Sequence, residues 1–250
     1  MAAPRRLLWL ACLAVGAPMA CGHPPFPKAA RVAENRAHSH RSYALSRSYF
    51  VSQLYDDNER WLLSERPSHE ISHRVSLKGA PIHPPKEIGV MPAGTQVVLE
   101  HIEFPTRTAV MRRMLNSPVH HIWLRLRPAP GALVSLPVDA RPFILVLEHP
   151  IDGHEELAAA LARHLSSPPA AAAWLDGLSP AVRAAVDSKR VVRGMDERSL
   201  LAAAGEPRAW RELGRVDGHV TRVARYDDVE AWLEDGVVTD LRAPAAPAPP

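Results

Sequence analysis

The chain has little cysteine, little lysine and no long apolar run after its N-terminus, and each shortage excludes a class of protein. Only two of the 250 residues are cysteine, which excludes a disulfide-rich scaffold. Positive charge is carried by scattered arginines without a compact basic block interleaved with aromatics, so nucleic acid is not expected as a partner. The glycine patterns of nucleotide-binding proteins and the G-x-S-x-G pattern of hydrolases are also missing.

The N-terminus has the pattern of a secretory signal. Arg5 and Arg6 precede an apolar run from Leu7 to Ala17, which small residues close. The run is too short for a spanning helix and has the length of a signal-peptide core. Residues 1–21 are therefore predicted to be a signal peptide, and the protein is predicted to be exported.

Cys21 directly follows Ala20 at the end of this segment. The arrangement resembles the lipobox of bacterial lipoproteins, whose cysteine receives the lipid and becomes the first residue of the mature chain. Cys12 would be removed with the signal, so lipidation would account for a mature chain with a single thiol. Gly22 after the cysteine implies the outer membrane if the enteric sorting rule applies. Pro18 stands where the motif usually has an aliphatic residue, and ordinary cleavage after Gly22 would give a soluble periplasmic or secreted protein.

The first half of the mature chain falls into two segments that differ in composition. Residues 22–47 contain Pro, Ala, His, Arg and Ser without apolar periodicity, which predicts a flexible tether. Residues 48–150 contain short β-branched and aromatic runs separated by prolines, which predict a β-rich domain, either a small barrel or a sandwich. The candidate strands are Tyr49–Leu54, Ile71–Leu77, Thr95–Phe104, Ile122–Arg127 and Phe143–Leu147.

Within residues 71–148, the phrase MPAGTQVVLEHI is followed later by HIWLRL. This combination is similar to bacterial SH3-like domains, in which a Gly-Thr turn starts one strand and a tryptophan opens a later one. The resemblance implies that the domain binds peptides or the cell wall. The strand that begins at Thr95 has two possible registers, which bury either Val97, Leu99 and His101 or, with a bulge, Val98, Ile102 and Phe104.

Residues 151–177 are predicted to link two domains. Asp152 and Glu155 form a capping box that opens a helix, and the prolines after Ser167 end it. Trp174, in the segment that follows, is expected to pack between the domains. The apolar stripe of the helix is Leu157, Leu161 and Leu165.

Residues 178–242 carry clear helix signals. Ser179-Pro180 opens one short helix, and Asp196 opens a second that stops at Gly205. A three-stranded antiparallel sheet is expected to follow, because β-branched and aromatic runs alternate with turns. Its strands are predicted at 220–226, 229–233 and 237–241, and residues 243–250 are predicted to be a disordered Pro/Ala tail.

Gly194 and Met195 precede the second of these helices, and Gly205 and Pro207 end it. Together with the aromatic strands and the late Asp-Gly turn, this order resembles the SmpA/OmlA family of bacterial outer-membrane lipoproteins, known through the BamE subunit of the β-barrel assembly machinery. The resemblance covers residues 178–242. It implies envelope or outer-membrane proteins as partners, a lipid anchor in the membrane, a periplasm-facing location and no cofactor.

The last hairpin predicts a partner-binding face. Leu233 pairs with Val237 or Val238, depending on the form of the turn at Asp235-Gly236. In either case Leu233 and Trp232 point to opposite faces of the sheet. If Leu233 packs on the helices, Trp232 stands on the open face with Glu230 and Glu234. Alternatively, the preceding domain or the Ala173-Trp174 segment covers it.

One motif points to an enzyme instead. His69-Glu70-Ile71-Ser72-His73 matches H-E-x-x-H, which on a helix places two imidazoles on one face for zinc and the glutamate beside the metal-bound water. Here Pro67 precedes the motif and the apolar residues alternate, which favours a strand and would hold His69 and His73 too far apart for one zinc. We therefore expect no metal site and no catalytic residue.

The sequence as a whole predicts an α+β protein with a β-rich domain, a linking helix and a BamE-like domain. The preferred interpretation is an envelope lipoprotein that acts as a protein-binding accessory or scaffold in envelope or outer-membrane assembly. Two alternatives remain open: an exported zinc hydrolase that uses His69, Glu70 and His73, and a cell-wall or inhibitor-type binding module.

Overall fold

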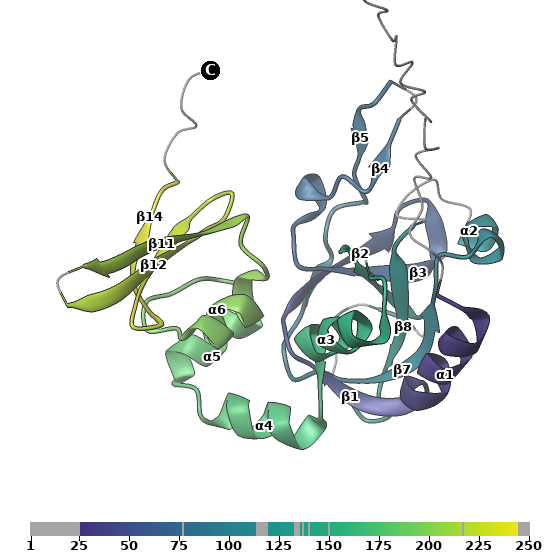
Figure 1. Ribbon diagram of the computed structural model, residues 1–250, viewed down its shortest axis with the longest axis horizontal. Coiled ribbons are helices and arrows are strands. Elements are labelled where there is room, and N and C mark those ends of the chain that lie inside the picture. The colour runs from purple at the N-terminus through teal and green to yellow at the C-terminus, as the bar shows by residue number, and fades with distance from the viewer. Residues whose placement is uncertain are drawn as a thin grey trace, which may run out of the picture.

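The computed structural model describes residues 26–76, 78–113, 120–132, 136, 138–139, 141–149, 151–216 and 218–244. In these ranges the protein is α+β, as expected, with six α-helices, a curled eight-stranded sheet and two smaller sheets (Figure 1). The predicted signal peptide with Cys21 and the last six residues of the predicted tail lie outside them. None of the helices in the described ranges has the length and apolar character needed to cross a membrane.

The N-terminal unit is built on the eight-stranded sheet, whose strand order is β10-β1-β7-β8-β9-β3-β2-β6. All its neighbouring strands are antiparallel except β3 and β9, which are parallel. The strands are β1 (Arg41–Leu45), β2 (Tyr49–Leu54), β3 (Asp57–Ser64), β6 (Gly89–Met91), β7 (Gln96–Glu103), β8 (Ile122–Pro128), β9 (Phe143–Leu147) and β10 (Leu165–Ser166).

Alternating side chains fill the inside of this sheet. In β8, Ile122, Leu124 and Leu126 lie in the main core, as their spacing predicts, while Trp123 points the other way and is buried under the Arg113 guanidinium. In β7, a bulge between Leu99 and His101 shifts the register. Both predicted registers are therefore used, one on each side of the bulge, and the buried residues are Val97, Leu99, Ile102 and Phe104.

The predicted flexible tether is wrong over its described part. Helix α1 (Lys28–His38) packs on the sheet, and β1 forms ladders with both β7 and β10. The Asn35 side chain fixes the helix, because its amide donates to the Ile102 carbonyl (3.0 Å) and accepts from the Ile102 N–H (2.8 Å). Polar side chains and backbone hydrogen bonds hold this segment in place. Its sequence therefore lacks the apolar periodicity from which a helix or strand is predicted.

The predicted strand 71–77 is also wrong for most of its length. The chain forms a short 3₁₀ turn, η1 (Ser68–Glu70), and then only a two-residue strand, β4 (Arg74–Val75), which pairs with β5 (Pro81–Ile82) in a hairpin that projects from the unit (Figure 1). Prolines on both sides of this segment remove ladder N–H donors and limit its pairing. Helix α2 (Arg107–Arg113), which the sequence analysis missed, follows β7.

Helix α3 (His154–His164) is confirmed as a helix but does not link the two units. Its stripe of Leu157 and Leu161, continued by Leu165, lies in the core of the N-terminal unit, and β10 then pairs with β1. The predicted capping box is wrong, because the N-cap is Gly153. The connection is made instead by α4 (Pro168–Asp176), whose N-cap Ser167 accepts from the Ala170 N–H.

The C-terminal unit contains both predicted helices, α5 (Pro180–Asp187) and α6 (Glu197–Ala204), capped by Ser179 and Asp196 as expected. They cover one face of an antiparallel sheet (Figure 1). The sheet has four strands where three were predicted, because a bulge between Glu212 and Gly214 breaks the alternation of its first strand. The strands are, in sheet order, β11 (Ala209–Val216), β12 (His219–Arg225), β13 (Glu230–Glu234) and β14 (Val237–Arg242).

Candidate functional site

The open face of the C-terminal sheet carries the predicted partner-binding residue Trp232. Leu233 is fully buried against the helices and pairs with Val238, so Trp232 points to the opposite face. The turn residues Asp235 and Gly236 both have positive φ, 49° and 83°, as a two-residue hairpin turn requires. The sequence is compatible with two registers here, and the backbone geometry of this turn selects the pairing of Leu233 with Val238.

Two guanidinium groups hold the Trp232 ring. The Arg242 guanidinium carbon lies 3.8 Å from the ring centroid, and that of Arg211 lies 5.9 Å from it. The indole Nε1 is buried and has no acceptor in the part of the chain that the structure describes. Trp232 is therefore a partly buried ring that arginines of its own sheet hold in one orientation.

The two predicted neighbours of Trp232 differ in exposure. Glu230 is only 8% exposed and its Oε1 lies 4.0 Å from Arg225 Nε. Glu234 is exposed at the end of the same strand. Trp232 and Glu234 can thus contact a partner directly. Glu230 is buried and interacts with Arg225 of the neighbouring strand β12.

The structure does not bring His69 and His73 together on an α-helix. The His69 side chain is 75% exposed beside the three-residue turn η1, and His73 Nε2 is hydrogen-bonded to Glu148 Oε1 at 2.9 Å. Glu70 lies 3.4 Å from an Arg208 nitrogen. Burial, followed by a hydrogen bond to Asp227, raises the Glu70 pKa. In the described ranges no group of three or more His, Cys, Asp or Glu is arranged to hold a metal ion.

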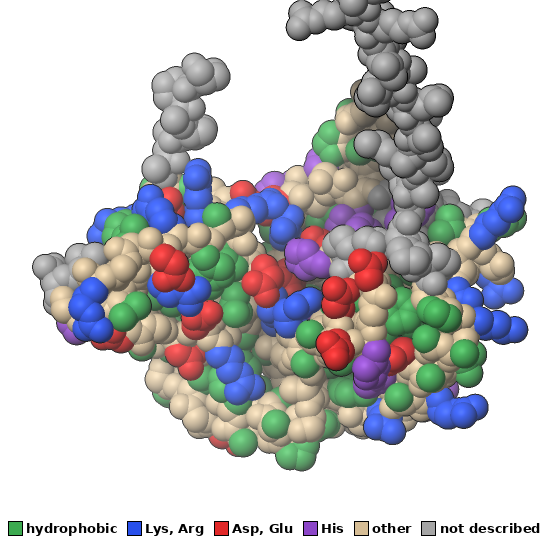
Figure 2. All heavy atoms as spheres, in the orientation of Figure 1, with side chains coloured by type: hydrophobic (Ala, Val, Ile, Leu, Met, Phe, Trp, Pro, Cys, Tyr) green, Lys and Arg blue, Asp and Glu red, His purple; other side chains and the backbone are tan. Residues whose placement is uncertain are grey.

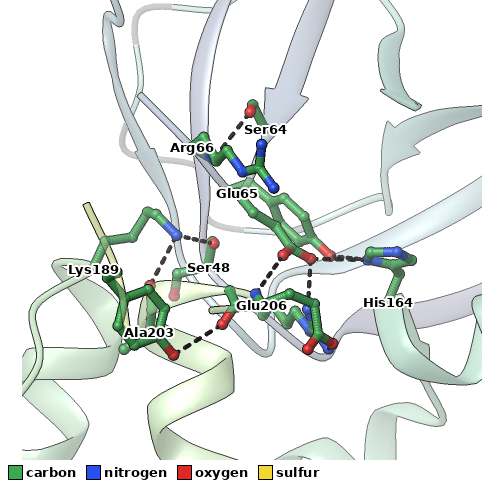
Figure 3. Close-up of polar contacts among 12 residues, drawn as sticks. Ser48, Ser64, Glu65, Arg66, His164, Lys189, Ala203 and Glu206 are labelled. Atoms are coloured by element: carbon green, nitrogen blue, oxygen red, sulfur yellow. Dashed lines mark hydrogen bonds and ion pairs between the residues drawn. The ribbon is translucent and has the colours of Figure 1, made fainter. Parts of the chain in front are cut away.

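A polar cluster that the sequence analysis missed joins the two units (Figure 3). Arg47, between β1 and β2, donates to Glu65 Oε1 (2.8 Å) and to Glu206 Oε1 (2.6 Å). The Glu206 backbone N–H in turn donates to Glu65 Oε2 at 3.0 Å. Glu206 follows α6, so a residue of the C-terminal unit completes the environment of a carboxylate of the N-terminal unit.

His164 closes the other side of this cluster. Its Nδ1 lies 2.9 Å from Tyr49 Oη and 3.4 Å from Glu65 Oε1. Burial lowers the pKa of His164 to about 4, against the opposing effect of Glu65. Burial alone would raise the pKa of Glu65, but Arg47 and His164 hold it below its ordinary value. At neutral pH the cluster therefore contains an ionised Glu65 and a neutral His164.

Lys189 and Ser48 make the second contact between the units. Lys189 Nζ donates to the carbonyls of Ser48 (2.9 Å) and Ala203 (2.8 Å), and Ser48 Oγ donates to the Val186 carbonyl (2.7 Å). Burial lowers the Lys189 pKa to about 8. Lys189 also has a φ of 54°, a conformation more typical of glycine at the end of a helix. No sequence pattern reveals these contacts, because their acceptors are backbone carbonyls distant in the chain.

A cleft of about 390 Å³ opens beside these contacts, lined by residues of both units that include Glu70, Lys189 and Asp227. The buried charged groups of the cluster are each engaged by a neighbour across the junction. This geometry can fix the two units in one relative orientation. Comparison with known proteins adds no assignment: no family model, no curated protein and no solved structure matches the chain.

Proposed function

We propose that the protein is a bacterial envelope lipoprotein, anchored through Cys21, whose BamE-like C-terminal unit binds envelope or outer-membrane proteins as an assembly accessory or scaffold. The observation that carries the proposal is the open face of the C-terminal sheet. Two helices occupy the opposite face, and Trp232 stands on the open one between Arg211 and Arg242.

An oriented tryptophan flanked by arginines has the chemistry of an interface anchor. Tryptophan and arginine are the residue types that most often contribute large binding energies at protein interfaces. Because the sheet already holds the Trp232 ring, a partner would order few additional side chains on binding. The buried indole Nε1 has no acceptor among the described residues, so a partner that reached it would satisfy a donor that the sheet leaves unpaired.

The residues that carry the family resemblance support the proposal, because their side chains and backbone angles form and end helix α6. Gly194 has a φ of 86°, Met195 is fully buried, and the Asp196 carboxylate caps α6 through the Ser199 N–H at 2.7 Å. Gly205 ends the helix with a φ of 80°. These are the positions at which the sequence resembles SmpA/OmlA proteins.

The anchor is tested by the intact mass of the mature protein from the membrane fraction of its native host. A chain that begins at Cys21 with a diacylglycerol adduct, absent from Cys21→Ser, is expected. This would place the protein on the periplasmic side of the outer membrane once the membranes are separated. An unmodified chain that begins near His23 would contradict the anchor and leave a soluble periplasmic or secreted protein.

The binding face is tested by photo-crosslinking in the native host. A photoreactive residue at the exposed Glu234 position is expected to crosslink to proteins of outer-membrane assembly, and one at Glu155 on α3 is not. Trp232→Ala should reduce the Glu234 crosslinks, whereas Trp210→Ala, which removes a tryptophan from the helix-covered face, should leave them. Crosslinks only to cell-wall proteins, or crosslinks that Trp232→Ala does not change, would refute the proposed partner class or face.

The zinc-hydrolase alternative gains no support from the geometry. A metalloprotease motif needs its two histidines one helical turn apart, and here a three-residue 3₁₀ turn is followed by irregular backbone. His73 is engaged by Glu148. The binding-module alternative is addressed by the identity of the crosslinked proteins.

A further inference from the structure

A second surface, on the N-terminal unit, has the chemistry of an anion-binding groove. It lies between α1, α2 and the strands β7 and β8 and has a volume of about 640 Å³. Five cationic side chains line it, against Glu103 as its one lining carboxylate. Figure 2 shows Lys and Arg side chains gathered on the side of the molecule where Figure 1 places α1 and α2. The five cations are Lys28, Arg31, Arg60, Arg112 and Arg125.

Three of these cations are free to bind a ligand. Arg60 is paired with Asp57, and Arg125 with Glu100. Lys28, Arg31 and Arg112 form no ion pair with any side chain that the structure describes. The groove's lone carboxylate, Glu103, is occupied by the buried Arg113. The groove therefore has an excess of positive charge that no described acidic side chain neutralises.

Exposed apolar side chains occur on both helices of the groove. Val32 on α1 lines the groove and is 50% exposed, and Met111, which precedes Arg112 on α2, is 73% exposed; apart from Val75, these are the largest exposed fractions among the described large hydrophobic residues. Neither helix is loosely attached: Asn35 fixes α1 to the Ile102 backbone, and Arg113 fixes α2 to the carbonyls of Glu103 and His121. Exposed apolar residues beside unpaired cations on rigid helices match a membrane surface, which has anionic headgroups above acyl chains.

The chain enters the fold at the wall of this groove. Phe26 packs against Phe104, with ring centroids 5.0 Å apart, and Phe104 lines the groove. Four residues lie between Cys21 and Phe26, so the Cα of Cys21 can lie at most about 18 Å from that of Phe26. A membrane that holds Cys21 is therefore within reach of the groove.

We propose that this groove binds the anionic phosphate headgroups of the membrane surface on which the protein is anchored. The proximity argument rests on the proposed lipid anchor, whereas the charge and apolar pattern does not. Binding would hold the N-terminal unit against the bilayer and, through the fixed junction between the units, orient the open face of the C-terminal sheet.

The test uses the chain that processing at Cys21 would leave, residues 21–250 with Cys21→Ser, so that no lipid contributes. Its sedimentation is measured with vesicles of phosphatidylcholine plus phosphatidylglycerol and with vesicles of phosphatidylcholine alone. Binding to the anionic vesicles that weakens as salt increases is expected. The triple variant Lys28→Glu, Arg31→Glu and Arg112→Glu should lower the affinity at least about tenfold, since each cation near an anionic surface contributes measurably.

A matched variant controls for net charge. Lys78→Glu, Lys86→Glu and Arg163→Glu reverse three exposed cations outside the groove and should leave binding within about twofold of the parent. Equal loss in the two triple variants, equal binding to neutral vesicles, or no binding to anionic vesicles would overturn the proposal, provided that thermal unfolding shows both variants folded. Because this chain carries no lipid, the result is independent of the mass measurement that tests the anchor.

Discussion

At Gly205 two constraints act on one residue. Its backbone angles, φ 80° and ψ −162°, belong to a region that glycine alone adopts without strain. A Cβ built on it would lie 2.5 Å from Glu65 Oε2 and 2.8 Å from Glu65 Cβ. Gly205 is predictable from the sequence as a helix stop, but the second constraint comes from Glu65 in the other unit, and only the tertiary structure shows it.

Gly205→Ala is therefore expected to destabilise the protein by about 2–4 kcal/mol, from backbone strain plus displacement of a buried carboxylate. Gly194→Ala is the matched control, because Gly194 also has positive φ (86°) but its Cβ would meet nothing within 4 Å. That variant should lose only about 1 kcal/mol. The measurement is the free energy of unfolding in urea, and equal losses would show that the approach to Glu65 is not a constraint.

His164 gives the cluster a pH dependence whose sign follows from its lowered pKa. The pKa falls from 6.5 to about 4 on folding. Between these values the unfolded chain binds the proton and the folded chain does not, so stability is lost as pH falls through this window. Glu65, whose folded pKa is also lowered, adds to the loss below its unfolded pKa.

From about pH 7 to about pH 5 we expect His164 to account for a loss of about 1–2 kcal/mol of unfolding free energy. His164→Gln should make the dependence shallower by that amount. Urea unfolding at the two pH values measures both slopes. Parallel slopes for the parent and the variant would mean that His164 does not titrate as its burial requires.

Among the elements, α1 shows how a polar side chain can dock a helix. Asn35 satisfies both the N–H and the C=O of Ile102 beside the β7 bulge, and Glu34 is hydrogen-bonded to His154 Nδ1 at 2.5 Å. Because these bonds are partly buried, removing one partner leaves the other without water to replace it.

Asn35→Ala is expected to cost about 1–3 kcal/mol of unfolding free energy and to raise amide exchange in α1 selectively. Asn35→Asp should cost at least as much, because it keeps the acceptor for the Ile102 N–H but turns a carboxylate oxygen toward the Ile102 carbonyl. Hydrogen exchange followed by mass spectrometry compares the two. If exchange in α1 stays unchanged in Asn35→Ala, the hydrogen bonds of Asn35 are not what holds the helix.

The elements also show where sequence patterns suffice. Helices α5 and α6 were predicted together with their caps, because Ser179, Asp196 and Gly205 bond to backbone groups only three or four residues away in the sequence. Strands β1 and β11 were missed because β1 carries polar side chains and β11 contains a bulge. Their pairing depends on neighbours that are distant in the sequence.

At the scale of the whole molecule, Arg47 connects the two units. Its side chain is 6% exposed and bridges Glu65 to Glu206. Removing one partner of a buried ion pair leaves an uncompensated charge, which is more costly than the net contribution of the pair itself. The junction is thus expected to couple the unfolding of the two units.

Arg47→Ala is expected to lower the unfolding free energy by about 3–5 kcal/mol and to split a single calorimetric transition into two. Arg222→Ala is the control, since Arg222 pairs with Glu197 and Glu212 inside the C-terminal unit and is more exposed. It should cost about 1 kcal/mol or less and keep one transition. A single transition in Arg47→Ala would show that other contacts couple the units.

The sequence alone determined several features that depend on neighbouring residues: the caps of α5 and α6, the Asp-Gly hairpin, the alternation in β8 and the opposite orientation of Trp232 and Leu233. These features follow from local backbone geometry and from the spacing of side chains along one element, so a short run of neighbouring residues is enough to specify them. Only the tertiary structure decided that residues 28–45 are part of the N-terminal unit and that α3 lies in its core. The same holds for Arg47, Glu65 and Glu206, whose pairing requires chain segments more than a hundred residues apart to be packed first, and for the groove, whose cations come from separate elements.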